Sequence, residues 1–483
     1  MDRRRPRHPG AGSRSGGSPL GDGRIWRGRE PGRLVRRRTS RIRDIRPDRI
    51  PVRRQPKILA GLGRRGVPAP TGSFGSRSAP GTQRRPRPDA PLPHRRPDVS
   101  LPLEGVKVLD LSRVLAGPYA TMSLADLGAD VLKVEHPERG DDTRHWGPPF
   151  AGEGEDRQSA YFLSVNRNKR SIGIDLKTPE GLERVKRLAA NADVLVENWR
   201  RGALEKLGLG YEELKATNPG LVYCSITGFG PGPDEDRPGY DFLAQARAGI
   251  MGITGFPNSD GGKPTKVGVA IADIVCGLHA ATAILAALHR RNATGEGVRI
   301  EVPLFESALS WLANRAQEYL VSGEDKGRMG NAHPTIVPYQ TFNASDKQIA
   351  VAVGNDAQFA RLCEALGRED LASDERYATN PGRVANRETL VADLQTEFSK
   401  HTAEEWVEKV REAGVPCGPV NTLAGVFEDK HVLGSGILQE VDHPTAGTIK
   451  LLASPVLIDG ERLPIRRPPP TLGQHTGEVG DGG

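Results

Sequence analysis

The chain has 483 residues, enough for two or three domains, and its formal net charge of +8 is distributed unevenly along it. Residues 1–98 hold 27 Lys and Arg against 7 Asp and Glu, whereas residues 99–483 hold 41 against 53. The larger part of the chain is therefore mildly acidic, which excludes the overall basic charge of a nucleic-acid-binding domain.

Residues 1–98 are rich in Arg, Pro, Gly and Ser and show no sustained hydrophobic periodicity. A segment of this composition cannot bury enough apolar surface to fold, so we predict a basic disordered extension. Three interpretations of it stay open. It is a tail that contacts nucleic acid or acidic partners, a targeting peptide whose prolines interrupt an amphipathic helix, or the product of a misplaced start site, because no methionine lies between Met1 and Met122.

An alternation of apolar strands and helices begins near Leu101. The predicted elements are strand 105–112, helix 117–129, strand 130–135, helix 178–191, strand 193–198 and strand 221–230. Strands that alternate with helices in this way are typical of βαβ units in a parallel sheet, so we predict an α/β domain over residues 99–322.

The stretch "KVGVAIADIVCGLHAATAILAALHRR", residues 266–291, predicts a further buried strand followed by a helix over 274–290 that is apolar all round. Asp273, its single acid, falls where the strand meets the helix. Asp is a favoured residue at helix N-termini, so Asp273 is interpreted either as a helix N-cap or as a nucleophile that the helix dipole keeps ionised.

After residue 322 the alternation resumes with a different composition. Its predicted elements are strand 347–355, helix 356–367, helices 384–399 and 403–413, a Gly/Pro-rich return over 414–423 and short strands around turns over 440–460. We predict a small α/β domain over 323–425 and a C-terminal return to the large domain over 426–483.

Several kinds of site are excluded by the motifs that the chain lacks. The turn "SRVLAGPYA" has no GxGxxG fingerprint for a dinucleotide, and "GFPNSDGGKPT" has the wrong glycine spacing for a P-loop. No HExxH, GxSxG or Cys/His cluster occurs, so we expect no metal and no serine nucleophile. The four cysteines are widely spaced, and we find no membrane-spanning apolar run or signal peptide, so we expect a cytoplasmic protein with no membrane partner.

Basic residues gather beside the predicted strands. They are Arg113, the run Asn168-Lys169-Arg170, Lys177 and the pair Arg200-Arg201. Taken singly, each fits a solvated rim. Because ligands of open α/β sheets bind at the carboxyl ends of the strands, the set also fits a multiply phosphorylated ligand.

Several segments, in order, resemble the class III CoA-transferases, the family that includes formyl-CoA transferase. They are "GVKVLDLSRVLAGPYATMSLADLGADVLKVEHPERGDDTR", "NRNKRSIGIDLKTPEG", "ADVLVENWRRGALEKLG", "GVAIADIVCGLHAA" and "GVPCGPV". The resemblance runs from Leu101 to Thr476, and "GNAHPTIVPYQTF" and "RRPPPTLGQHT" are most similar to the succinate–hydroxymethylglutarate CoA-transferase branch. It implies a Rossmann-like large domain, a small α/β domain and an interlocked homodimer.

The resemblance also implies the site residues. The family nucleophile is the aspartate of a "GD" or "AD" pair, which here is Asp273. The implied CoA-site residues are Arg113, Val114, Leu115, Ala116, His136, Ile174, Lys177, Asn198, Trp199, Arg200, Lys206 and Tyr240, of which His136 and Lys206 stand where the family has arginines. CoA thioesters are the implied substrates, with no metal and no tightly bound cofactor.

The implied reaction moves CoA from a donor, succinyl-CoA or another dicarboxyl-CoA, to an acceptor acid through an anhydride and a thioester on Asp273. The glycine-rich loop of formyl-CoA transferase has no counterpart over 322–342, which argues against formate or oxalate. One alternative is a 2-methylacyl-CoA racemase, whose relatives carry His at the position of Tyr240; a phenol is a poor base at neutral pH. Another is a nucleic-acid-associated protein that binds through residues 1–98.

Overall fold

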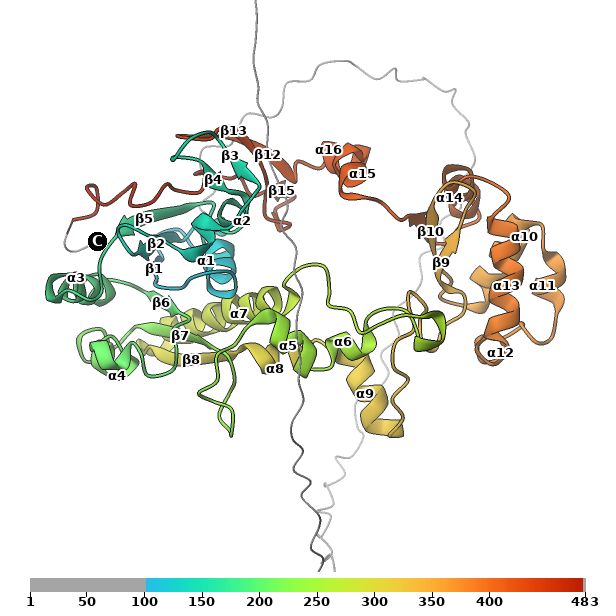
Figure 1. Ribbon diagram of the computed structural model, residues 1–483, viewed down its shortest axis with the longest axis horizontal. Coiled ribbons are helices and arrows are strands. Elements are labelled where there is room, and N and C mark those ends of the chain that lie inside the picture. Colours follow the sequence, from blue (N-terminus) through green and yellow to red (C-terminus); the bar gives the residue numbers. More distant parts are fainter. Residues whose placement is uncertain (1–100, 481–483) are drawn as a thin grey trace, which may run out of the picture. The chain divides into compact units, whose positions relative to one another are not determined.

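The computed structural model describes residues 101–480 (Figure 1). Our predictions for residues 1–98 lie outside the described residues. The described chain is built on a six-stranded parallel sheet with the order β5-β2-β1-β6-β7-β8. The strands are β1 (Lys107–Asp110), β2 (Asp130–Glu135), β5 (Lys169–Gly173), β6 (Val194–Glu197), β7 (Val222–Thr227) and β8 (Val298–Pro303).

The sheet order reverses direction at β1, which lies between β2 and β6. The chain runs outward from β1 to β2 and β5 on one side, and through β6, β7 and β8 on the other. In open parallel sheets such a switch point opens a crevice at the carboxyl ends of the strands, where ligands bind. The predicted α/β class and the parallel βαβ arrangement are confirmed.

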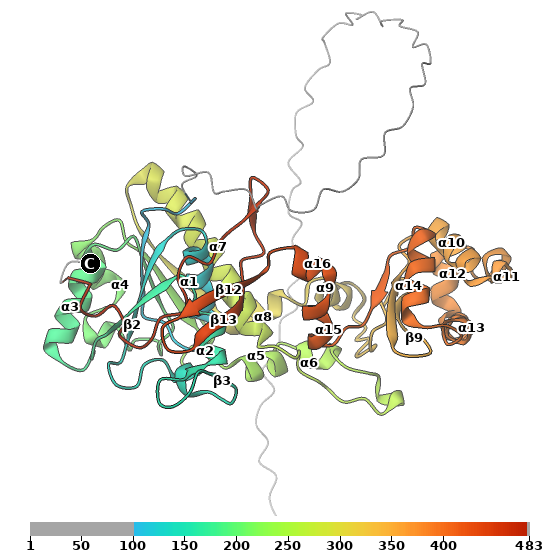
Figure 2. The same cartoon turned by 90° about the horizontal axis from the view of Figure 1, so that it is seen from above.

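Helices cover both faces of the sheet (Figures 1 and 2). Alternate residues of a strand face opposite sides, so Val108 joins the cluster beneath α1 (Ala116–Asp126) and α7 (Ile271–Thr294), whereas Leu109 joins the one beneath α3 (Pro179–Ala190) and α4 (Tyr211–Thr217). Strands buried on both faces are nearly continuous apolar runs, which is why sequence patterns locate them well.

The structure corrects two expectations about the stretch around α7. Residues 266–270 form no strand, and α7 begins at Ile271 with Ala270 as its N-cap, so Asp273 lies in the first turn and is not the cap. The helix is also not buried all round, because Leu278, His279 and Thr282 are exposed.

The length and composition of α7 are those of a helix that could cross a membrane, contrary to our expectation that no apolar run was long enough. Its buried face packs against α1, α8 (Leu304–Ser310), β7 and β8. Core helices of globular domains meet the same criterion.

The small domain is a three-stranded antiparallel sheet, β11-β10-β9, with helices packed against it (Figure 1). Its elements are β9 (Tyr339–Asn343), β10 (Gln348–Ala352), α10 (Asp356–Leu366), α11 (Glu369–Ser373), α12 (Asn380–Ala385), α13 (Arg387–Phe398), α14 (Ala403–Glu412) and β11 (Cys417–Pro419). Side-chain caps begin three of its helices: Asn355 caps α10, Thr379 caps α12, and Thr402 forms a capping box with Glu405 at α14.

The C-terminal segment lies partly beside the parallel sheet. It forms the hairpin β12 (Leu438–His443) and β13 (Gly447–Leu452) and then the short strands β14 (Leu457–Ile458) and β15 (Glu461–Arg462). The chain then runs beside β5, where the Asn168 N–H donates to the Arg467 carbonyl at 3.0 Å and the His475 N–H to the Ser171 carbonyl at 2.9 Å.

The other elements connect these units. They are η1 (Asp142–His145), β3 (Phe150–Ala151), β4 (Gln158–Ser159), α2 (Ala160–Ser164), η2 (Glu205–Leu207), α5 (Asp241–Arg247), α6 (Ile250–Ile253), η3 (Asn258–Asp260), α9 (Ala313–Ser322), α15 (Leu423–Glu428) and α16 (Lys430–Gly434).

Candidate functional site

Two adjoining cavities lie at the carboxyl ends of β1, β2, β5, β6 and β7. The first, which we call the cationic cavity, has a volume of about 820 Å³, and the second, the Asp273 cavity, of about 780 Å³. They share a wall that contains Arg113, Asp142, Trp199 and Arg200. A long ligand can therefore occupy both cavities and place one end beside Asp273.

All thirteen residues that the resemblance implies line these cavities. The cationic cavity is lined by His136, Ile174, Lys177 and Lys206, the Asp273 cavity by Val114, Leu115, Ala116, Asn198, Tyr240 and Asp273, and both by Arg113, Trp199 and Arg200. The fold thus brings together residues from the segments after β1, β2, β5, β6 and β7 and from the first turn of α7, while their individual roles stay predictions.

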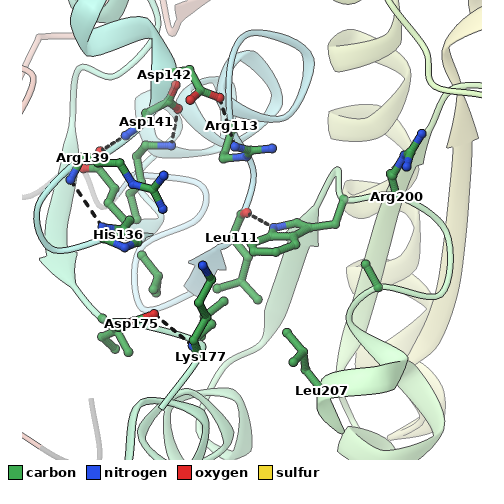
Figure 3. Close-up of a pocket in the computed structure, with 18 of the residues that line it drawn as sticks. Leu111, Arg113, His136, Arg139, Asp141, Asp142, Asp175, Lys177, Arg200 and Leu207 are labelled. Atoms are coloured by element: carbon green, nitrogen blue, oxygen red, sulfur yellow. Dashed lines mark hydrogen bonds and ion pairs between the residues drawn. The ribbon is translucent and has the colours of Figure 1, made fainter.

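Seven Lys and Arg side chains and five carboxylates line the cationic cavity, some of which are shown in Figure 3. Arg113 pairs with Asp142 at 3.0 Å, a contact in which both side chains are half exposed. Among residues 101–480, no carboxylate lies within ion-pair distance of Lys177, Arg200 or Lys206. Cations without acidic partners in one cavity suit a ligand with several phosphate groups.

Two basic residues expected near the ligand lie elsewhere. Lys169 is fully buried and donates to Asp110, to the Pro118 carbonyl at 2.9 Å and to Asn166 at 2.9 Å, and burial lowers its pKa to about 8. Arg170 donates two hydrogen bonds to Asp130, at 3.0 and 2.6 Å. Neither residue lines either cavity, and Lys169 is not part of a solvated rim, so of the two interpretations left open the ligand site fits neither residue.

Asn198 and Trp199 hold the turn that follows β1. Asn198 accepts from the Arg113 N–H at 2.8 Å and donates to the Arg113 carbonyl at 2.7 Å. The indole N–H of Trp199 donates to the Leu111 carbonyl at 2.9 Å, and the Arg113 guanidinium lies 5.6 Å from the centre of its ring. The segment after β6 therefore shapes the part of the wall that both cavities share.

Asp273 projects from the first turn of α7 into the second cavity. Burial raises the pKa of its carboxyl to about 7, and the neighbouring Asp241 adds to the shift. Both causes favour the protonated carboxyl, opposite to the direction expected from the helix dipole. A buried carboxyl with a strongly raised pKa in a cavity is a candidate for a chemical role.

Asp241 performs the cap role that the sequence suggested for Asp273. One of its oxygens accepts from the Ala272 N–H of α7 at 2.9 Å, and the other accepts from the Gln245 amide at 2.8 Å. Gln245 in turn accepts from the Val267 N–H at 2.9 Å, which fixes the segment that leads into the helix. Because the Ala272 N–H is already bound to Asp241, it does not serve as the oxyanion donor that a free helix start would offer.

Tyr240, the N-cap of α5, is 66% exposed and forms part of the outer wall of the Asp273 cavity. Its position depends on a close approach of two backbones, because a Cβ atom on Gly228 would lie 2.4 Å from the backbone nitrogen of Gly239. Only glycine fits there. The contact holds the loop with Tyr240 and Asp241 against the end of β7.

Sequence reasoning did not find Asp241, Trp146 or Tyr161. Trp146 lines the Asp273 cavity and packs edge-on against Tyr161, with ring centres 5.0 Å apart. Burial, together with the charge of Asp273, raises the pKa of Tyr161 to about 12. Trp146 follows a 3-10 turn, where no periodic pattern points to it, whereas Asp241 directly follows Tyr240 and could have been inferred from that position.

Comparison with known proteins gives these residues a context. Residues 103–476 match the model of "CoA-transferase family III". The chain is 46% identical over 379 residues to a Homo sapiens protein named "Succinyl-CoA:glutarate CoA-transferase", covering 78% of this chain and 85% of that protein. It is 41% identical over 386 residues to a Haloarcula hispanica "Succinyl-CoA:mesaconate CoA-transferase", covering 78% and 96%. A crystal structure of "a CAIB/BAIF family protein from Brucella suis" superimposes with a TM-score of 0.70 and 47% identity, covering 79% of this chain and 98% of that one.

Proposed function

This chain belongs to CoA-transferase family III and is a CoA-transferase, and from that premise we propose that it moves CoA from succinyl-CoA to a second dicarboxylic acid. The observation that carries the proposal is the shared wall of the two cavities. The cationic cavity suits the phosphates of CoA, and the Asp273 cavity brings the thioester end to a carboxylate.

The choice of substrates rests on the two relatives. Both are named with succinyl-CoA as donor, whereas the acceptors in their names are glutarate and mesaconate. Both acceptors are five-carbon dicarboxylates. We therefore assign succinyl-CoA to the donor position and a dicarboxylate of about this size to the acceptor position.

The first half-reaction transfers CoA to the protein. A carboxylate oxygen of Asp273 attacks the thioester carbonyl of succinyl-CoA, the C–S bond breaks, and CoA thiolate leaves a mixed anhydride. The thiolate then attacks the Asp273 carbonyl carbon of the anhydride and releases succinate. The product is an aspartyl-CoA thioester.

The second half-reaction runs these steps in reverse with the acceptor. The acceptor carboxylate attacks the aspartyl thioester and releases thiolate, which then attacks the acceptor carbonyl of the new anhydride and restores Asp273. Each step consumes one anion and produces one, so no proton changes hands. The protein's task is to hold CoA in place and to keep water from the anhydride and the thioester.

We also propose that the protein is a cytoplasmic homodimer, interlocked as the family resemblance implies. Large apolar side chains on α9 and α15 support a dimer, since Leu320, Val321 and Leu423 are 73%, 77% and 79% exposed. The four free cysteines suit a reducing compartment. We expect light scattering to give the molar mass of two chains. The molar mass of a single chain at micromolar concentration would contradict the dimer.

The test of function offers succinyl-CoA together with glutarate, mesaconate or butyrate and follows the CoA esters by mass spectrometry. We expect glutaryl-CoA or mesaconyl-CoA with an equal amount of succinate, and little product from butyrate. Asp374→Ala, which removes a carboxylate of the small domain that is paired with Arg376 and lines neither cavity, is the matched control for Asp273→Ala. Deuterium uptake at C2 of a 2-methylacyl-CoA without acyl exchange contradicts the proposal.

A further inference from the structure

The turn between β1 and α1 holds a strained residue beside the Asp273 cavity. Val114 has φ +71°, in the left-handed region that β-branched residues rarely adopt. Arg113, Val114, Leu115 and Ala116 of this turn line the Asp273 cavity. A strained conformation beside a binding site persists only where the surrounding structure holds it.

Side chains from three other segments hold the backbone of this turn. Three side chains donate to carbonyls of the turn: Trp199 to Leu111 at 2.9 Å, Lys133 to Ser112 at 2.8 Å and Asn198 to Arg113 at 2.7 Å. Three side chains accept from its N–H groups: Asp110 from Ser112 at 3.0 Å, Asn198 from Arg113 at 2.8 Å and Asp141 from Val114 at 3.2 Å. The strained residue itself is held by Asp141.

Asp141 lines the cationic cavity, but its oxygens point into the protein. It is 1% exposed, and besides Val114 it accepts from the Thr143 N–H at 3.0 Å and the Thr143 hydroxyl at 2.8 Å. Lys133, which is fully buried, lies 2.9 Å from its second oxygen. With these partners Asp141 is occupied by the protein and has no role as a ligand for phosphate.

The pair keeps its charges in the folded protein. Burial alone would raise the pKa of Asp141, yet the Lys133 ammonium and the Thr143 donors hold it well below its ordinary value. Burial alone would lower the pKa of Lys133, yet the carboxylates of Asp141, Asp110 and Glu135 raise it. Lys133 thus binds both the turn, through Ser112, and the carboxylate that holds the turn.

We propose that Lys133 and Asp141 are positioning residues that hold the left-handed turn at Val114 in the shape that receives CoA before CoA arrives. The inference rests on the proposed function, since it concerns the same cavities. It predicts that loss of Asp141 weakens the binding of CoA itself and leaves the acceptor acid unaffected.

The test compares Asp141→Asn with Asp126→Asn. The control breaks a buried ion pair, Asp126 with Arg167 at 2.5 Å, that lines neither cavity. We expect both variants to melt earlier than wild type, and only Asp141→Asn to raise the Kd for CoA in calorimetry, by roughly tenfold or more. The KM for the acceptor acid stays at the wild-type value in both.

A second variant separates strain from simple loss of stability. Glycine adopts φ +71° without strain, so a turn carrying Val114→Gly needs less support from Asp141. We expect Asp141→Asn to raise the Kd for CoA by a smaller factor when Val114→Gly is also present. Equal factors in the two backgrounds overturn the proposal.

Hydrogen exchange on wild type covers the case in which Asp141→Asn fails to fold. We expect the peptide over residues 111–116 to be protected without CoA, with little further change when CoA binds. Rapid exchange that slows only when CoA is bound overturns the proposal. The proposal is also overturned if Asp141→Asn and Asp126→Asn have the same Kd for CoA while the wild-type protein transfers CoA. If wild type binds no CoA at all, the proposed function and this inference are both overturned.

Discussion

The Asp241→Asn variant offers a quantitative test of how Asp273 is tuned. Burial and then the charge of Asp241 raise the pKa of Asp273 to about 7. Asparagine keeps an oxygen for the Ala272 N–H that Asp241 binds, at 2.9 Å, and removes the charge together with the hydrogen bond from the Gln245 amide. The pKa of Asp273 should therefore fall, because loss of a nearby like charge favours the ionised carboxylate.

The size of the effect follows from the titration of one group. Burial is the larger cause, so we assign to Asp241 a shift of about one pH unit, equal to about 1.4 kcal/mol. Only ionised Asp273 attacks the thioester, so kcat/KM for succinyl-CoA rises with pH through this pKa. When kcat/KM of each protein is divided by its own maximum at high pH, we expect this ratio at pH 6 to be about fivefold higher for the variant than for wild type.

The assay measures kcat/KM for succinyl-CoA between pH 5 and 9, with a fixed concentration of glutarate. Asp374→Asn, which removes a charge of the small domain that lines neither cavity, is the control, and its acid limb should coincide with that of wild type. The reasoning is refuted if the acid limb of Asp241→Asn stays in place or moves to higher pH.

Three further predictions concern stability, CoA affinity and the N-terminal segment. The pKa of Asp273 in the folded protein, about 7, exceeds the ordinary value of 3.8, so this carboxyl destabilises the fold increasingly as pH rises from about 4 to 7. Asp273→Asn should therefore unfold at a higher temperature than wild type at pH 8, and at the same temperature as wild type at pH 4. Lys177→Ala and Arg200→Ala should each raise the Kd for CoA, by roughly three- to tenfold at low salt and less at 0.5 M salt, and a salt-independent effect contradicts a phosphate contact. A chain without residues 1–98 retains residues 103–476, which match the family, so its rate of acyl exchange should equal that of the whole chain. If the whole chain instead binds nucleic acid in a salt-sensitive way and the deletion abolishes this binding, the alternative of a nucleic-acid-associated protein is favoured.

The fold was predictable where strands are buried on both faces. β1, β2, β6 and β7 are short apolar runs between turns, and helices separate them in a regular order. β8 was missed because it alternates apolar side chains with Arg299 and Glu301 at the sheet edge, where one-sided exposure weakens the signal. The stretch 266–270, predicted as a buried strand, forms no strand, and β8 is the strand that pairs with β7 at the edge of the sheet.

The residues that line the two cavities were predictable from the sequence, whereas the contacts and charge states of these residues were predictable only in part. Strand ends and family resemblance together identified residues that the fold brings to two cavities. Pairings across long sequence separations were not predictable, since nothing local tells that Lys169 turns inward to Asp110 or that Asp141 holds Val114. The charge state of Asp273 was likewise out of reach, because it depends on burial and on Asp241.

The central claim is that Asp273 carries CoA, and mass spectrometry of the protein tests it most directly. Wild type and Asp273→Ala are incubated with succinyl-CoA alone, digested at low pH, and searched for a CoA thioester on the peptide that contains residues 271–290. The account predicts CoA on Asp273 of wild type, its disappearance when glutarate is added, and no adduct or acyl exchange in Asp273→Ala. An adduct on another residue, or acyl exchange that survives in Asp273→Ala, would contradict it.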